Sequence, residues 1–143
     1  MSDNRRMKRS ANYILAIGCM VTIFIFSSQG HEVSSGQSMK VVNTVSATTG
    51  VQIPEKMIRK SAHVLLYSLL GVLIYNVAKG YSYKRRTLIM ASVALVCIYA
   101  ISDETHQYFV GGRSAEAGDV LLDTAAGSIG IFGYYGVIKR NNS

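Results

Sequence analysis

The sequence predicts an all-α integral membrane protein, a bundle of four transmembrane helices. Hydrophobic residues make up 49% of the 143 residues and the mean hydropathy is +0.23, more apolar than a soluble domain of this size requires. Stretches without Asp, Glu, Lys or Arg run through residues 10–30, 61–78, 87–102 and 124–138. Because a spanning helix needs about 20 mainly apolar residues, we expect one transmembrane domain over residues 1–143, with spans at about 10–29, 61–79, 86–104 and 119–138.

The first span, 10–29, is the only one whose uncharged run is comfortably long enough to cross the bilayer. A cleaved signal peptide is the alternative interpretation, with a basic start, an apolar core and the small residues Ser28 and Gly30 at a possible cleavage site. We favour a retained helix, because the apolar stretch is long for a signal and its removal would leave an odd number of spans.

The segment between the first two spans is polar and contains the only proline, Pro54. Within it, residues 34–47 place Val41, Val42 and Val45 among polar side chains. This pattern predicts a short amphipathic helix that rests on the outer membrane surface.

The remaining three runs reach spanning length only by including His63, Asp103 or Asp123. Either they are core helices of a soluble four-helix bundle, or they carry ionisable groups below the lipid headgroups. Residues 14–26 and 88–101 are apolar around their whole circumference, whereas a small soluble bundle would have polar faces at helical period. We therefore expect membrane-spanning helices.

The fourth span contains Gly127, Gly130, Gly133 and Gly136. Small residues allow transmembrane helices to approach one another closely. We interpret these glycines as a packing surface, with a groove for a lipid or substrate as the alternative.

The distribution of basic residues predicts the orientation. Ten of the fifteen precede the first span, lie in the short loop 79–86 or follow the fourth span, whereas every acidic residue except Asp3 lies in the other segments with the remaining five. By the positive-inside bias, both termini are cytoplasmic. The net charge of +7 is therefore divided among separate loops and does not form one basic patch. We expect no nucleic-acid partner.

With this topology, polar residues gather at the extracytoplasmic ends of all four helices. We expect them to converge into a polar pocket, because helix ends on one side of the membrane are neighbours. The candidate residues are Ser28 and Gln29; Arg59, Lys60, His63 and Tyr67; Asp103, Glu104, His106 and Gln107; and Arg113, Asp119 and Asp123. Asp123 needs a partner at its depth, for which Arg113, Lys60 and His63 are candidates.

Two chemistries fit this set of residues. Basic side chains such as Lys60, Arg59 and Arg113 suit the phosphate or carboxylate of a lipid headgroup or lipid-linked cell-wall precursor, and in an enzyme His63 or His106 is the candidate base with Asp103 and Glu104 as orienting or acid groups. A divalent metal is the other possibility, but no zinc signature such as H-E-x-x-H is present. We therefore expect no metal and no other cofactor.

At these residues the chain resembles the VanZ-like family of small membrane proteins. The strongest part is Ser102-Asp103-Glu104-Thr105-His106-Gln107-Tyr108-Phe109, followed by Gly112-Arg113-Ser114 and by Asp119 to Thr124 with Gly127. Weaker elements are Phe26-Ser27-Ser28-Gln29 and the stretch from Arg59 to Tyr67. Gly111 stands where a proline is common. Leu66 stands where many members carry an acid, which weakens any mechanism that needs a proton carrier beside Tyr67.

The resemblance implies a bacterial plasma-membrane protein with a role in low-level resistance to teicoplanin-type lipoglycopeptides. Three hypotheses follow. The protein binds an anionic envelope lipid or precursor in its outer pocket, it is an intramembrane hydrolase or transferase acting on a lipid headgroup, or its polar cluster only fastens the helices together. The sequence leaves its enzymatic status and its oligomeric state open.

Overall fold

The structure is a computed structural model that describes residues 2–29, 31–51, 53–81, 83–110 and 116–141. Its elements are helices: α1 (Ser2–Ser28), α2 (His31–Thr49), α3 (Glu55–Ala78), α4 (Arg85–Tyr108) and α5 (Ala117–Asn141). The described residues contain no strand. The all-α class predicted from the sequence is confirmed.

Four of the helices are long and apolar enough to cross a membrane, over Arg9–Ser28, Glu55–Ala78, Arg85–Tyr108 and Ala117–Asn141. Large apolar side chains point away from the bundle, among them Ile14, Leu65 and Ile129, which are each 70% exposed or more. A soluble bundle would place such side chains inside, whereas a bilayer solvates them. The four-span prediction is thus supported over the soluble alternative.

Helix α3 is central, because it packs against each of the other four helices. Its closest neighbour is α5, and the two backbones approach through small residues. A Cβ added to Gly71 would lie 2.2 Å from the carbonyl oxygen of Gly127, and one added to Gly130 would lie 2.1 Å from that of Ser68. The predicted packing role therefore holds for Gly127 and Gly130, while Gly133 and Gly136 have nothing within 4 Å of an added Cβ.

Helix boundaries follow local chemistry. Pro54 precedes α3, where a missing N–H costs no hydrogen bond, and Glu55 places an acid at the positive end of the helix dipole. Lys139 and Arg140 stand in the last turn of α5, at its negative end. Helix α4 continues to Tyr108, beyond the expected span end at 104, so the polar residues 103–107 are helical.

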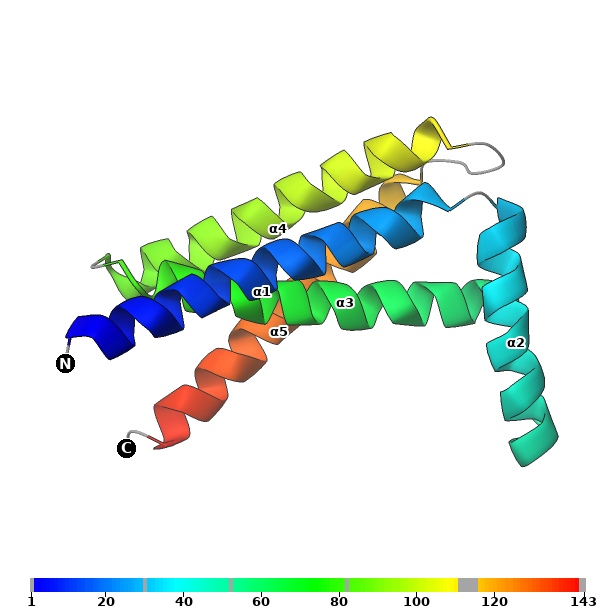
Figure 1. Cartoon of the computed structure of the whole chain (residues 1–143), viewed down its shortest axis with the longest axis horizontal. Coiled ribbons are helices and arrows are strands. Elements are labelled where there is room, and N and C mark those ends of the chain that lie inside the picture. The colour runs from blue at the N-terminus through cyan, green and yellow to red at the C-terminus, as the bar shows by residue number, and fades with distance from the viewer. Residues whose placement is uncertain (1, 30, 52, 82, 111–115, 142–143) are drawn as a thin grey trace.

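Figure 1 shows both termini at one end of the bundle and α2 lying steeply across the other end, against the start of α3. A helix is thus present where the sequence predicts one, and it extends over more residues than 34–47. Its position on the membrane surface and the cytoplasmic location of the termini stay predictions.

Candidate functional site

The four helix ends that carry the polar residues meet at the end of the bundle near α2 (Figure 1). These are the end of α1, the first turns of α3, the end of α4 and the start of α5. Spacing within each helix turns the relevant side chains to a common face, as for Asp103 and Gln107 on α4 or Asp119 and Asp123 on α5, which are four residues apart.

Asp103 is held at the centre of this end of the bundle and is 3% exposed. The Ser27 hydroxyl donates a hydrogen bond of 2.9 Å to its Oδ2, and the Gln107 amide donates one of 3.1 Å to the same oxygen. The other oxygen, Oδ1, has no hydrogen-bond partner in the described part of the chain. The contacts therefore join α1 to α4 and orient the carboxylate while one buried oxygen stays available.

His63 and Asp123 join α3 to α5 beside this carboxylate. The His63 Nδ1 lies 3.4 Å from Asp123 Oδ2, and Asp123 is 3% exposed. Of the three candidates for its partner, the structure thus brings His63 to Asp123. The imidazole also stacks on the Tyr67 ring, with 6.2 Å between ring centroids. One ligand atom from each of His63, Asp103 and Asp123 lies within 4.8 Å of the others, a grouping that has the donors to hold a metal ion.

Ion pairs lie beside this buried cluster, on its outer side. Lys60 contacts Asp119 directly, and the Lys56 Nζ lies 3.2 Å from Glu116 Oε1. Glu104 is 5% exposed and accepts a hydrogen bond of 2.8 Å from the backbone N–H of Glu116. These contacts connect α3 and α4 to the start of α5 and place Lys56 and Lys60 at the outer edge, each paired with an acid.

Several predicted site residues lie elsewhere. His106 hydrogen-bonds Ser28 at 3.0 Å and stacks on Phe24 at 4.5 Å, so it sits on the α1 side and does not share the cluster of His63. Arg59 pairs along its own helix with Glu55, at 3.8 Å. Gln29 is half-buried after α1. Arg113, Gly111 and the Gly112-Arg113-Ser114 element fall outside the described residues, so the structure does not test their role.

Sequence reasoning missed Ser27 as a site residue and chose its neighbour Ser28. Ser27 is fully buried and holds Asp103, whereas Ser28 is exposed. The signal was the pattern Phe26-Ser27-Ser28-Gln29, which does not tell which serine faces inward.

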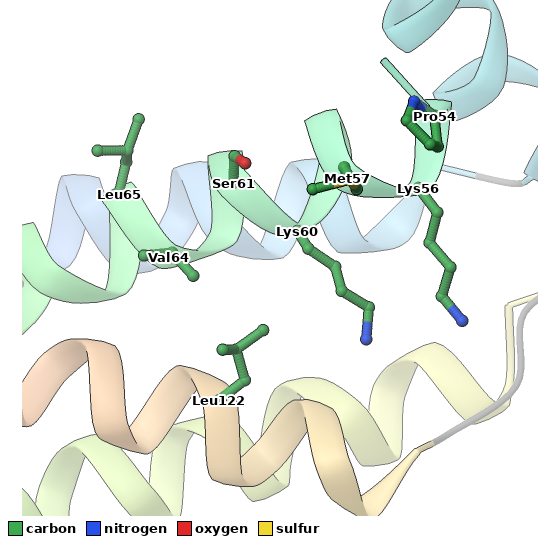
Figure 2. A pocket seen from close by; sticks show the side chains of 8 residues that line it. All are labelled: Pro54, Lys56, Met57, Lys60, Ser61, Val64, Leu65 and Leu122. Carbon is green, nitrogen blue, oxygen red and sulfur yellow. The ribbon is translucent and has the colours of Figure 1, made fainter. Parts of the chain in front are cut away.

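A groove between α3 and α5 opens beside the ion pairs. It encloses about 660 Å³ and is lined by Pro54, Lys56, Met57, Lys60, Ser61, Val64, Leu65 and Leu122. Figure 2 shows both lysine side chains extending from α3 on the side of α5, with Leu122 pointing from α5 toward α3. The groove is thus apolar along most of its length and basic at one end, a shape that no pattern in the sequence predicted.

Chemically, the site combines a buried cluster of a histidine and two carboxylates, which has the donors for a cation, with two lysines at its outer edge, which have the donors for an anion. The hypothesis of an enzyme stays a prediction. The two histidines proposed as alternative bases lie in different surroundings, and only His63 has a carboxylate beside it.

Comparison with known proteins gives one family match. Residues 12–139 match the VanZ/LLP1 family. No curated protein and no solved structure matches the chain. The match covers nearly the whole chain, with the second and third spans complete and most of the first and fourth. This membrane protein therefore belongs to the VanZ/LLP1 family.

Proposed function

We propose that the protein binds an anionic lipid, either a phospholipid or a lipid-linked cell-wall precursor, at the extracytoplasmic end of the groove between α3 and α5. The observation that carries the proposal is the juxtaposition of an apolar groove of about 660 Å³ with Lys56 and Lys60. An acyl or isoprenoid chain would lie against Met57, Val64 and Leu122, and its phosphate would reach the two ammonium groups. Lysine binds phosphate as a compact point charge.

The ion pairs of the two lysines allow a lipid phosphate to replace a carboxylate partner. Lys56 and Glu116 have side chains that are 58% and 44% exposed, and a pair that is open to water contributes at most about 1 kcal/mol. A phosphate can therefore replace Glu116 as the partner of Lys56 at little cost. Lys60 is less exposed and keeps Asp119 on its other side, which would hold its ammonium group in position for the headgroup.

In a bacterial plasma membrane, a protein that holds such a lipid would reduce the access of teicoplanin-type lipoglycopeptides to it. Expression in a susceptible Gram-positive host should then raise the teicoplanin concentration that stops growth. Lys56→Gln with Lys60→Gln should abolish that increase at an equal amount of membrane protein, whereas Lys84→Gln, at the opposite end of the bundle, should preserve it. An unchanged increase in the double variant would contradict the proposal.

Direct binding can be measured on the purified chain by native mass spectrometry with phosphatidylglycerol, phosphatidylcholine and a polyprenyl pyrophosphate. We expect the two anionic lipids to stay bound, and each lysine substitution to weaken them about tenfold, because one hydrogen bond to a charged group contributes roughly 1.5 kcal/mol or more. The preferred anionic lipid distinguishes a phospholipid from a precursor.

A second pair of variants tests the groove without changing charge. Ser61→Phe places a ring among the lining residues, and Ala62→Phe places the same ring on the neighbouring exposed position, which does not line the groove. We expect only Ser61→Phe to weaken lipid binding. Equal binding by both variants would show that the acyl chain does not occupy the groove.

A further inference from the structure

We propose that His63, Asp103 and Asp123 form a binding site for a divalent transition-metal ion such as Zn²⁺. The three ligands come from α3, α4 and α5, and their donor atoms lie within 4.8 Å of one another. The His63 to Asp123 distance of 3.4 Å equals the separation of about 3.4 Å between two ligands on a tetrahedral ion with bonds of 2.0–2.1 Å.

Two buried polar atoms at the cluster lack a partner. The Asp103 Oδ1 and the Tyr67 hydroxyl belong to side chains that are 3% and 0% exposed, and neither has a hydrogen-bond partner among the described residues. Tyr67 interacts electrostatically with both carboxylates and approaches Asp103 most closely, without a hydrogen bond of good geometry between them. Buried polar groups are almost always satisfied. A metal ion would bind Oδ1 directly, and a water on that ion would satisfy the hydroxyl.

Charge at this depth also favours a cation. Asp103 and Asp123 are buried at the end of two membrane spans, and Lys60 is engaged with Asp119. Intramembrane carboxylates are paired as a rule, and a divalent ion would neutralise both. Ser27 and Gln107 would act as outer partners that orient the ligand carboxylate, as hydrogen-bonding neighbours do around metal sites.

The ligand types decide the class of metal. Ca²⁺ and Mg²⁺ prefer sites made of oxygen alone, whereas imidazole with carboxylates suits Zn²⁺ and its first-row neighbours. The expectation of no metal rested on ligand spacing along one helix. Here each ligand comes from a different helix, so a sequence signature of that kind cannot exist.

The test uses the full chain, purified in detergent with a tag that lacks histidine, treated with a chelator and then given Co²⁺ or Zn²⁺. We expect one equivalent of Zn²⁺ by calorimetry, and Co²⁺ absorption bands typical of a coordinated ion. His63→Gln, Asp103→Asn and Asp123→Asn should each weaken binding at least tenfold. His106→Gln and Glu55→Gln are matched controls, because they remove a histidine and a carboxylate that lie outside the cluster, and they should leave binding unchanged.

Absence of stoichiometric Zn²⁺ binding by the folded wild-type chain would overturn the proposal, as would equal losses in the controls. If the ligand variants do not fold, Ser27→Ala provides the test, since loss of an outer partner lowers metal affinity about 10- to 100-fold. Unchanged affinity in Ser27→Ala would count against the site. The measurement needs no added lipid, so its outcome is independent of the groove and of the proposed lipid binding.

Discussion

Gly130 on α5 lies against the backbone of α3, and Gly130→Ala tests whether close helix packing holds the site together. An added Cβ would be 2.1 Å from the Ser68 carbonyl oxygen, whereas ordinary contacts begin at 3.4 Å. Because that oxygen belongs to the backbone, no side-chain rotation relieves the overlap. The two helices must separate or slide at the level of the bundle where α3 and α5 are closest.

Overpacking of this kind typically costs about 1–3 kcal/mol. For a chain of this size the cost corresponds to a fall of about 3–10 °C in the unfolding midpoint. Gly133→Ala is the matched control, because an added Cβ there meets nothing within 4 Å. Since alanine favours helix over glycine by about 1 kcal/mol in water, Gly133→Ala should be neutral or slightly stabilising.

The chain carries its own probe for this measurement. Cys19 is 8% exposed in the core of the bundle, so a thiol-reactive fluorescent dye reports its exposure as the detergent-solubilised protein unfolds. Cys97→Ser removes the second thiol, which is only half-buried. Equal unfolding midpoints for Gly130→Ala and Gly133→Ala would refute the packing argument, because they would show that α3 and α5 do not touch at this level.

Three further predictions concern hydrogen bonds and orientation. Ser27→Ala should cost about 1–3 kcal/mol in the same dye assay, because it removes the 2.9 Å bond to buried Asp103. Tyr99→Phe should cost about 0.5–1.5 kcal/mol, because the hydroxyl donates a 2.6 Å bond to the Met20 carbonyl. Tyr83→Cys should react with an impermeant maleimide only after cells are opened, and labelling of intact cells would reverse the predicted topology.

The fold and the position of the site were predictable from the distribution of charged residues along the sequence. Long uncharged runs predicted four spans, and the structure contains four helices of suitable length and composition. Successive spans alternate in direction, which predicted that Lys60, Asp103 and Asp123 lie at the same end of the bundle. The lipid imposes these features, because a spanning segment must be apolar over the thickness of the bilayer and its backbone N–H and C=O groups must hydrogen-bond within the helix.

The pairings within the site were not predictable, because they depend on the rotation and depth of each helix. One residue along a helix turns a side chain by about 100°, which separates buried Ser27 from exposed Ser28 and turns His106 toward Phe24, away from His63. The groove was missed for a related reason. Its lining residues are ordinary apolar side chains, and only the crossing of α3 and α5 leaves space between them.

Three different interactions hold the bundle along its length, and together they explain how the site keeps its geometry. Lipid removes the hydrophobic drive for helices to associate, so close packing and polar contacts must supply it. Hydrogen bonds such as that from Ser27 to Asp103 hold the end near α2, and close packing occupies the middle, where Gly71 meets Gly127. At the end with the termini, Arg9 lies 4.4 Å from the Tyr81 ring centroid and Lys79 lies 4.9 Å from that of Tyr134.

The glycine contacts in the middle set how closely α3 and α5 approach, and therefore whether His63 can reach Asp123. Side chains larger than glycine at 127 or 130 would increase the distance between α3 and α5, both at the glycines and at the level of the site. The close packing of the middle layer and the polar contacts above it therefore depend on each other, because a change in the separation of α3 and α5 at the glycines also changes the distance from His63 to Asp123.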